Sequence, residues 1–551
     1  MRPSLHRLRP LALSLLAGCY NSDAFDKLNA QDSGASTSSD PETATSVVSV
    51  TVSASATGSS SSGSGVDSST TEGAGSGAEP TSGTTSGGAG PTVSLTVDPP
   101  LLELAGPVEV TVEHSADAVR FELWDAIDNE HFQAEWLKGQ KPPSYVLTQG
   151  APGEIRSLTV RAYDNEGNVG VSTPATVELQ LPASGTVLWE TEVALDELTQ
   201  ARALTSGIYT NSVAVFPGYD AGQAARVSRV NAQGQVNLNA PVAEALSTTT
   251  GVALTPDGFV LAAGVDLLEN NKNIGWVARV NPSDAGVERI WEGKIGESYT
   301  GLAYDPEAER IYLSGYAPKG LQAHDARLWA LSAEGDLLWW QAWERPVSKL
   351  LDEGKPVDRG LAVAVLENGD PVLVGETWHL PDEKEKPDRW AFVLRYSPTG
   401  LLGDDRIWTS AESTNYAGAL GVSADADNGI LVAGWSSPLE GAHQATVWAF
   451  DEFLQPAEIY TQGLSDTTAK AVARLTTGEI VTVIDVDSDE RHDFEVRATE
   501  SGFTAAWTRV FAGGSETRGA ALTITPHGHI VVAGNRVEGN TVTMLLIGLH
   551  S

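Results

Sequence analysis

The sequence predicts an all-β protein, in which a β-sandwich is followed by a seven-bladed β-propeller that an N-terminal strand closes. Three observations predict this fold. Residues 93–183 contain short apolar stretches that alternate with period two, as the strands of a sandwich do. Residues 184–551 contain a unit that recurs seven times, at spacings of 46 to 60 residues. The last unit lacks its fourth strand, and residues 186–193 carry the missing pattern ahead of the first unit.

Residues 1–19 combine a basic segment, a short apolar stretch and the sequence Leu-Ala-Gly-Cys. This pattern resembles the bacterial lipobox, in which small residues precede the cysteine that becomes the lipidated N-terminus. The resemblance implies an exported protein of the cell envelope, anchored in the membrane through lipid on Cys19, the only cysteine. Tyr20 is not the Asp of an inner-membrane retention signal, so we expect the outer membrane, facing either the periplasm or the cell surface. The alternative is an ordinary secretory signal with a chance cysteine.

Residues 20–92 are rich in Ser, Thr and Gly, and residues 28–92 contain no aromatic residue, Lys or Arg. Such a segment buries too little apolar area to offset the entropy of ordering it, so we expect a disordered linker. The formal net charge of −37 opposes binding to nucleic acid. A chain with one cysteine forms no intramolecular disulfide. Separately, we expect the protein to be a monomer.

The predicted sandwich covers residues 93–183. The segment Asp-Asn-Glu-Gly-Asn at residues 164–168 predicts a hairpin loop, because these residues tolerate left-handed backbone angles. The phrase Val-Arg-Ala-Tyr-Asp-Asn-Glu-Gly-Asn-Val-Gly at residues 160–170 resembles the last hairpin of bacterial immunoglobulin-like domains. The resemblance implies an immunoglobulin-like β-sandwich. Asp164 and Glu166 are expected to lie in a solvated hairpin tip, with calcium binding as the alternative.

The repeat unit is clearest at residues 251–291, where two apolar strands precede strands centred on Trp276 and Trp291. The landmark at the end of the second strand recurs at positions 218, 264, 315, 375, 434, 485 and 534, with Asp in place of Gly at 485. Runs such as residues 260–263 and 530–533 are apolar throughout, as strands covered on both faces are. The recurrent tryptophans are expected to pack between diverging sheets, and ligand stacking is the alternative.

Two phrases of the repeat carry a further resemblance. Pro-Asp-Gly-Phe-Val-Leu-Ala-Ala-Gly at residues 256–264 resembles the delta-60 and SBBP-type bacterial propeller repeats. Leu-Leu-Trp-Trp at residues 337–340 is similar to quinoprotein-like propellers such as outer-membrane assembly lipoproteins. The resemblance covers about two thirds of the chain. It implies an architecture and no particular activity, because propellers host many unrelated functions.

Acidic residues offer the only cofactor hypothesis, which is calcium. Asp485, Asp487 and Asp489 alternate along one segment, as oxygen ligands for calcium can. The segment lacks the central glycine of an EF-hand loop, and Val496 occupies the place of the bidentate glutamate. A solvated turn is therefore the default, and no other cofactor is expected. Phosphate-binding loops, zinc-protease motifs and nucleophile elbows are absent from the folded region of the sequence.

Aromatic residues mark a candidate binding face. Tyr219, Tyr316 and Trp435 follow the second-strand landmark of their units, and Trp378 lies close behind another. All four are predicted to begin loops on one face of the propeller, where exposed aromatics are typical binding anchors. The alternative is that they pack beneath their own loops. Histidines fall in the same loops at positions 324, 379, 443 and 492, but on separate blades they are expected to be too far apart to share a metal ion.

These features predict a lipid-anchored, non-catalytic scaffold whose propeller face binds a protein or glycan partner of unidentified structure. The alternative is a propeller enzyme, such as a lyase, hydrolase or quinoprotein, with its site at the axial mouth. Convergent His, Asp, Glu or Arg side chains at the central channel would favour the enzyme, and a bare channel with aromatic-rich loops would favour the scaffold. We expect the scaffold.

Overall fold

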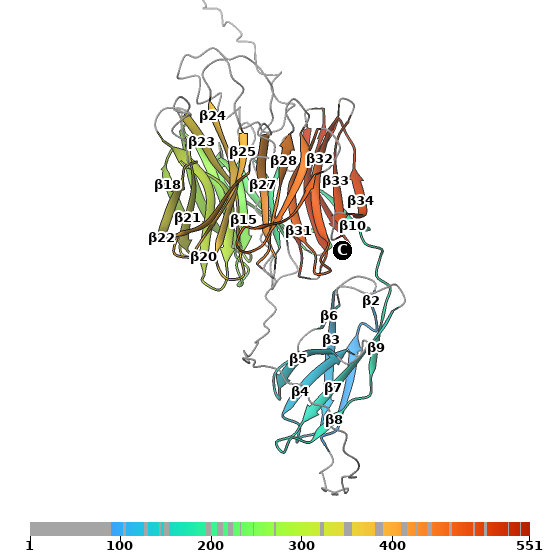
Figure 1. Cartoon of the computed structure of the whole chain (residues 1–551). Helices are drawn as coiled ribbons and strands as arrows, with labels where there is room; N and C mark the ends of the chain where they lie inside the picture. The colour runs from blue at the N-terminus through green and yellow to red at the C-terminus, as the bar shows by residue number, and fades with distance from the viewer. Residues whose placement is uncertain are drawn as a thin grey trace, which may run out of the picture. The chain divides into compact units, whose positions relative to one another are not determined.

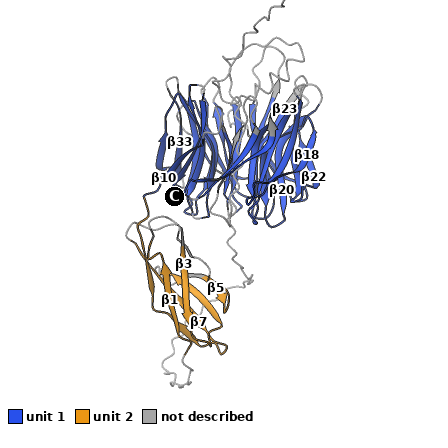
Figure 2. Cartoon of the chain, turned by 180° about the vertical axis from the view of Figure 1, so that it is seen from behind, with its two compact units in different colours: residues 1–54, 183–551 blue, residues 55–182 orange. Residues whose placement is uncertain are grey.

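The computed structural model describes residues 90–551 apart from short segments, so the lipobox and nearly all of the predicted linker lie outside the described residues. These segments are residues 103–105, 126–130, 143–144, 148–153, 194–199, 207–212, 219–223, 232, 246, 269–271, 320–323, 346–354, 381–388, 409–415, 426–427, 438–442, 462–465, 489–490, 501–503, 527 and 540. The described residues form 37 strands and no helix, which confirms the predicted all-β class. Membrane-spanning helices are accordingly not found in this part of the chain. Figure 2 colours the two compact units of the chain. In sequence order, the first described unit ends at residue 182 and is unit 2 of the figure, and the second begins at residue 183 and is unit 1 of the figure.

The first unit consists of two sheets. One contains β1 (Val93–Asp98), β3 (Gly106–His114) and β6 (Tyr145–Leu147). The other contains β2 (Leu101–Leu102), β9 (Ala175–Leu179), β7 (Ile155–Tyr163), β4 (Arg120–Asp125) and β5 (His131–Leu137), with β8 (Val169–Val171) paired to β7. Phe121, Leu123 and Leu158 are almost fully buried in its core. The predicted hairpin loop is confirmed between β7 and β8, where the Asp164 carboxylate accepts hydrogen bonds from the backbone of Glu166 and Asn168.

The strands of the second unit form seven antiparallel groups of four among the described residues, and we number these groups as sheets 1 to 7. Sheet 1 contains β11 (Gln200–Ser206), β12 (Val213–Gly218), β13 (Ala224–Val230) and β14 (Val236–Ala245), and sheet 2 contains β15 (Ser247–Leu254), β16 (Val260–Leu268), β17 (Lys272–Val280) and β18 (Val287–Ile295). Sheet 3 contains β19 (Ser298–Asp305), β20 (Arg310–Pro318), β21 (His324–Ser332) and β22 (Leu337–Trp343), and sheet 4 contains β23 (Lys355–Val365), β24 (Pro371–Leu380), β25 (Arg389–Tyr396) and β26 (Leu402–Trp408). Sheet 5 contains β27 (Tyr416–Ala424), β28 (Ile430–Ser437), β29 (Gln444–Phe450) and β30 (Pro456–Thr461), and sheet 6 contains β31 (Thr467–Arg474), β32 (Ile480–Ser488), β33 (Arg491–Thr499) and β34 (Ala505–Phe511). Sheet 7 contains β35 (Glu516–Ile524), β36 (Ile530–Glu538), β37 (Thr541–Leu549) and the early strand β10 (Val187–Val193).

These sheets follow one another around a common axis as a β-propeller (Figure 1). The first strand of each sheet contacts the first strand of the next, and β35 of sheet 7 contacts β11 of sheet 1, so the series closes on itself. Sheets 3 and 4 are also joined by one parallel bridge between His324 and Val357. β10 pairs with β37 and aligns Trp189 with Gly548, which is the pairing that the sequence predicts.

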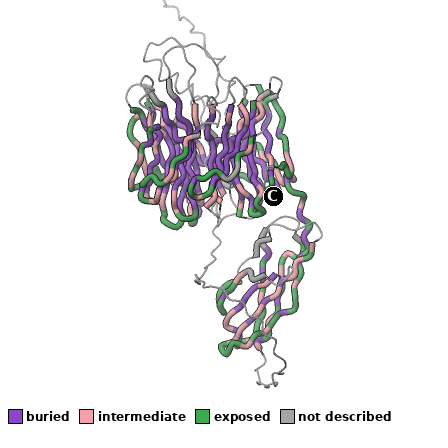
Figure 3. Tube along the Cα trace, viewed as in Figure 1, coloured by how far each residue is buried: buried purple, intermediate pink, exposed green. Residues whose placement is uncertain are grey.

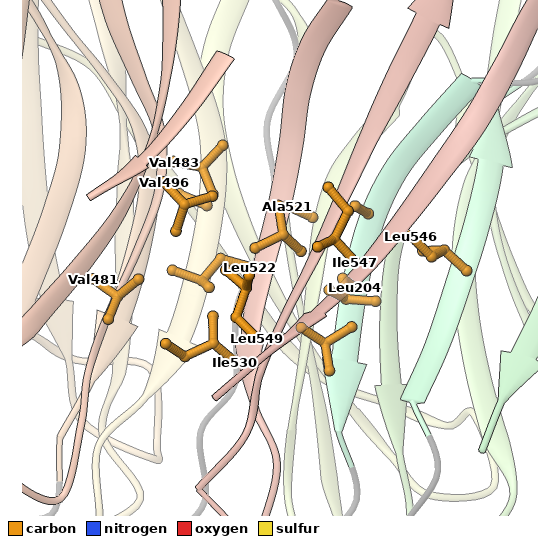
Figure 4. Packing of buried hydrophobic residues seen from close by; sticks show 14 of the residues in the cluster. Leu204, Val481, Val483, Val496, Ala521, Leu522, Ile530, Leu546, Ile547 and Leu549 are labelled. Atoms are coloured by element: carbon orange, nitrogen blue, oxygen red, sulfur yellow. The ribbon is translucent and has the colours of Figure 1, made fainter. Parts of the chain in front are cut away.

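The apolar strand runs of the repeat lie between neighbouring sheets (Figure 3). Every residue of 260–263 and 530–533 is at most 2% exposed, as predicted for strands covered on both faces. Figure 4 shows side chains of β11, β32 and sheet 7 meeting in one cluster, among them Leu204, Val483 and Ile547. Trp276, Trp329 and Trp448 are also at most 2% exposed, so these tryptophans pack between sheets as expected.

The outermost strand of a sheet packs on a turn of the next sheet. Gly234 and Gly400 adopt positive φ angles of 77° and 85° in such turns. A Cβ atom at either glycine would lie within 2.5 to 2.8 Å of the Trp189 or Trp339 ring. The Trp339 Nε1 group also donates a hydrogen bond of 2.9 Å to the carbonyl oxygen of Pro398. Glycine is therefore required at these turns both for the backbone angle and for the close approach of the ring.

The strand register corrects two of the sequence landmarks. In most sheets a β-bulge in the first strand lies opposite the second-strand glycine, as at Gly375. In sheet 6 the residue opposite the bulge is Ile484, so Asp485 lies one position beyond the landmark. In sheet 1 the residue opposite the bulge is Pro217, and Gly218 likewise lies one position beyond the landmark. Asp485 therefore does not replace a glycine; it occupies the position that Tyr316 holds in sheet 3.

Candidate functional site

Three of the four predicted binding aromatics lie at the same end of three successive sheets. Tyr316 is on β20, Trp378 on β24 and Trp435 on β28, whereas Tyr219 lies outside the described residues. Tyr316 is partly exposed, but Trp378 and Trp435 are only 8% and 5% exposed. The prediction that these two tryptophans are exposed anchors is therefore wrong. Their ring faces are covered by neighbouring cationic or histidine side chains. The loops of the alternative prediction, residues 381–388 and 438–442, lie outside the described residues.

Two arginines join the aromatics into a continuous row. The guanidinium carbon of Arg359 lies 5.1 Å from the Tyr316 ring centroid and 4.6 Å from that of Trp378. The guanidinium carbon of Arg389 lies 5.3 Å from the Trp378 ring and 5.9 Å from the Trp435 ring. These are cation–π distances. We call these five residues the aromatic–arginine row.

A histidine lies at each end of the aromatic–arginine row. The His324 ring meets the Tyr316 ring edge-on, with 5.2 Å between the centroids. The His443 ring stacks on Trp435 at 4.1 Å. The two histidines are thus separated by the whole row, in agreement with the expectation that they do not share a metal ion. His492 instead bonds to Asp487 in sheet 6, and the side chain of His379 lies outside the described residues.

Strand register explains why these residues meet. Tyr316 and Trp435 each follow the glycine of their second strand, and Glu376 holds that position in sheet 4 between them. Arg359 is the cross-strand partner of Glu376, and Arg389 is the partner of Trp378. Side chains opposite one another on adjacent strands lie within reach of each other. The sequence carries a signal for both arginines, because they directly precede the landmarks Gly360 and Trp390.

A buried carboxylate, Glu376, adjoins both arginines of the aromatic–arginine row. Glu376 is 2% exposed and is the carboxylate nearest to both guanidinium groups by strand register. Its distance to Arg389 is 3.9 Å, and its Oε2 atom makes no hydrogen bond. Arg389 retains 16% of its side-chain exposure and donates no hydrogen bond to any described residue. The row therefore presents a partly exposed guanidinium group that is not engaged by a carboxylate at hydrogen-bond distance.

A second polar group lies between sheets 3 and 4. Asp358 is fully buried and accepts a hydrogen bond of 3.3 Å from the backbone nitrogen of Arg345. The Arg345 guanidinium group lies over the Trp390 ring. Burial raises the pKa of Asp358 to about 6, and the negative charges of Asp325 and Glu344 act in the same direction. This is a buried carboxyl group that titrates near neutral pH.

Asp358→Asn should therefore stabilise the protein at pH 8 and much less at pH 5. Because the folded-state pKa is raised above its usual value near 3.8, the stability linked to this group is present at low pH and is lost as the pH rises through about 6. Above that pH the buried carboxylate costs on the order of 3 kcal/mol. Thermal unfolding followed by circular dichroism between pH 5 and pH 8 measures the effect. Asp336→Asn, at an exposed turn position, is the control. An equal change in Tm at both pH values would show that Asp358 ionises normally.

The predicted calcium ligands lie in a different ionic cluster. Asp485 is 3% exposed; its Oδ2 atom lies 3.5 Å from Lys470 Nζ, and its Oδ1 atom accepts a 2.7 Å hydrogen bond from the backbone nitrogen of Gly519. Burial raises the pKa of the Asp485 carboxyl, although Lys470 and Arg518 oppose this. Burial also acts to raise the pKa of Asp487, but Arg518 and His492 outweigh this effect, so the pKa of Asp487 is lowered.

Basic side chains thus already surround the two described carboxylates of the calcium hypothesis. Asp489 lies outside the described residues. No group of three or more His, Cys, Asp or Glu side chains in the described ranges is arranged to hold a metal ion. The bonds to Lys470, Arg518 and His492 disfavour calcium at Asp485 and Asp487, because a cation would have to displace them.

Comparison with known proteins identifies no family for this chain, because no family model and no curated protein matches it. Solved structures do match. They include an ulvan lyase (9% identity, TM-score 0.46, covering 65% of this chain and 96% of the lyase) and a chain of the mitotic checkpoint complex (10% identity, TM-score 0.43, covering 67% and 94%). A quinonprotein alcohol dehydrogenase-like protein from Bacteroides thetaiotaomicron matches at 9% identity and a TM-score of 0.36, covering 76% of this chain and 96% of that protein. Similarity at this level says nothing about what this chain binds or does, and its fold is established by its own strand pairing.

Proposed function

We propose that the protein is a lipid-anchored, extracytoplasmic β-propeller that binds a protein or glycan partner without catalysing a reaction. The observation that carries the proposal is the aromatic–arginine row across sheets 3, 4 and 5. Tyr, Trp and Arg are the residue types enriched at the centres of binding interfaces. A row of interlocked side chains also holds its geometry before a partner arrives, which lowers the entropic cost of binding.

Tyr316 offers the direct test, because it is the partly exposed aromatic of the row. We expect Tyr316→Ala to weaken binding of a ligand found by screening the full-length protein on a glycan array and against purified envelope proteins. Trp340→Ala is the matched control, since Trp340 is 43% exposed and also lies beneath an arginine, but on the outer strand β22. A ligand that loses affinity equally with both variants, or only with Trp340→Ala, would show that the row is not the binding face.

The lipid anchor is a separate part of the proposal and rests on residues 16–19. Metabolic labelling with a fatty-acid analogue should tag the wild-type protein and not Cys19→Ala, because the cysteine thiol is the acceptor in a lipobox. Envelope fractionation should place the wild-type protein in the outer membrane. Equal labelling of the two proteins would exclude lipidation at Cys19.

The finer architecture also belongs to the proposal. We take the seven described sheets as the complete set of blades, sealed by β10, and the unit ending at residue 182 as an immunoglobulin-like domain. Support for the blades comes from the contact between β35 and β11, which closes the series. Support for the second assignment comes from two facing sheets with a shared apolar core.

A propeller enzyme is the second candidate, and the buried Asp358 favours it. A carboxyl group with a pKa of about 6 is suited to act as a general base near neutral pH. Buried charged residues are also present on the inner strands of the propeller, such as Arg359 and Lys470. Incubating the full-length protein with acidic and neutral polysaccharides, and following chain length, tests this candidate. Cleavage by the wild type that Asp358→Asn abolishes would overturn the non-catalytic proposal.

A further inference from the structure

Arg389 differs from other arginines of the propeller that contact aromatic rings. Arg279, Arg289 and Arg395 lie over Phe259, Trp276 and Phe453. Each of these three also donates a hydrogen bond to a carboxylate. Arg389 contacts two tryptophan rings, keeps 16% of its exposure and donates no such bond within the described residues. Among the residues that the structure describes, no carboxylate therefore takes up its hydrogen-bonding capacity.

The surroundings of Arg389 fix which part of it a ligand can meet. Trp378 and Trp435 lie at 5.3 and 5.9 Å from its guanidinium carbon. A guanidinium group carries its five N–H donors in its own plane, so contacts with rings leave the donors at its edge free. The edge of a held guanidinium group matches the paired oxygens of a carboxylate or a sulfate.

The local charge agrees with an anionic ligand. Arg359 and Arg389 both adjoin Glu376, so two guanidinium groups and one carboxylate meet in this strand register. These guanidinium groups stand within a chain of net charge −37. Guanidinium groups attract an anionic group at short range, while the net charge of the chain repels long polyanions.

The low exposed fractions of the two tryptophans favour a small charged group on a sugar, rather than a protein surface, as the ligand. Trp378 and Trp435 are 8% and 5% exposed, so neither ring stands clear to fill a pocket of a protein partner, as aromatic anchors of protein interfaces do. What the row offers is the edge of Arg389, with the partly exposed Tyr316 near one end of the row and the partly exposed His443 at the other.

We propose that Arg389 is the anchor for an oxyanion, a carboxylate or a sulfate ester, carried by a glycan. This inference rests on the proposed binding function and names the class of ligand. Trp378 and Trp435 hold the guanidinium group in position, and Arg359 contributes the second positive charge.

Isothermal titration of the full-length protein in detergent tests the inference with four probes: an oligogalacturonate, a sulfated galactan oligosaccharide, a neutral galacto-oligosaccharide and a polyglutamate peptide. We expect a charged oligosaccharide to bind, and Arg389→Gln to weaken it by about 10- to 100-fold. Tighter binding of the oligogalacturonate would identify the oxyanion as a carboxylate, and tighter binding of the sulfated oligosaccharide would identify it as a sulfate ester. Arg279→Gln, which removes the same charge from an arginine already bonded to Glu288, should leave the affinity unchanged. Melting curves of both variants check that the fold is intact.

Several outcomes would overturn the inference. Equal binding of the neutral and charged oligosaccharides, unaffected by Arg389→Gln, would refute it and leave the proposed binding function standing. An equal loss with Arg279→Gln would show a general charge effect. Binding of polyglutamate alone would make the partner an acidic protein segment, and no binding of any probe would remove the support for a glycan ligand altogether.

Discussion

Deletion of residues 185–193 should abolish the closed propeller. The deletion removes β10 and leaves β37 of sheet 7 with an unpaired edge. It also removes the Trp189 ring, which packs against Gly234 of sheet 1 and Gly548 of β37. We expect aggregation or a large fall in Tm, measured by light scattering and thermal unfolding. Trp189→Ala alone should cost about 3 kcal/mol, at the lower end for a tryptophan because the ring is only partly buried.

The control for this prediction is deletion of residues 20–92, which should leave the melting of the propeller unchanged. The pairing of β10 with β37 joins segments some 350 residues apart, but the entropy cost of closing such a loop grows only logarithmically with its length. A 185–193 deletion that stays monomeric and melts like the parent would mean that β10 does not seal the ring. An eight-bladed or open arrangement would then have to be considered.

Lys470→Leu should strongly destabilise the propeller. Lys470 and Asp485 are 9% and 3% exposed, and their charged groups are 3.5 Å apart. Removing the lysine leaves a buried carboxylate without its nearest cation, which typically costs 3–5 kcal/mol. Leucine itself fits this position, because Leu361 and Leu420 are the bulged residues at the equivalent positions of sheets 4 and 5. The loss should be measurable by urea unfolding at pH 7.5.

Two comparisons separate charge from packing in this experiment. The double variant Lys470→Leu with Asp485→Asn should recover most of the loss, because asparagine is neutral and still accepts the hydrogen bond from Gly519. Lowering the pH to 5 should also reduce the cost of Lys470→Leu, since burial raises the pKa of Asp485 and protonation removes the charge. If neither change restores stability, the effect of the lysine is steric rather than electrostatic.

The propeller was predictable from sequence because the inner strands of its sheets are buried almost throughout. Runs such as residues 530–533 are covered on both faces, so apolar composition alone locates them. The pattern shared by residues 186–193 and the other fourth strands was enough to predict the partner of β10. The position of Asp485 was predicted wrongly, because a one-residue bulge shifts the register and leaves no mark in composition.

The candidate site was predictable only in part. Repeat alignment placed Tyr316, Trp378 and Trp435 on one end of neighbouring sheets, since equivalent positions of a repeat share a face. It did not predict their burial, which depends on Arg359 and Arg389 lying over the rings. Those contacts join side chains 11 or more residues apart, brought together by cross-strand pairing and by packing between sheets. Spacing within one unit contains no information about them.

The entry of the chain into the propeller has a mechanical consequence. The Ser184 hydroxyl donates to the carbonyl oxygen of Ser551, the Gly185 nitrogen to that of His550, and the Arg509 side chain to the carbonyl oxygen of Gly185. Any tension carried by the chain from its N-terminal side reaches these bonds first and then the β10–β37 pairing. Tension along the strand loads that pairing in shear, whereas tension across it opens the bonds one at a time. Resistance to such force is a matter of unfolding rate, so a single outer strand sets the lifetime of the whole ring under load.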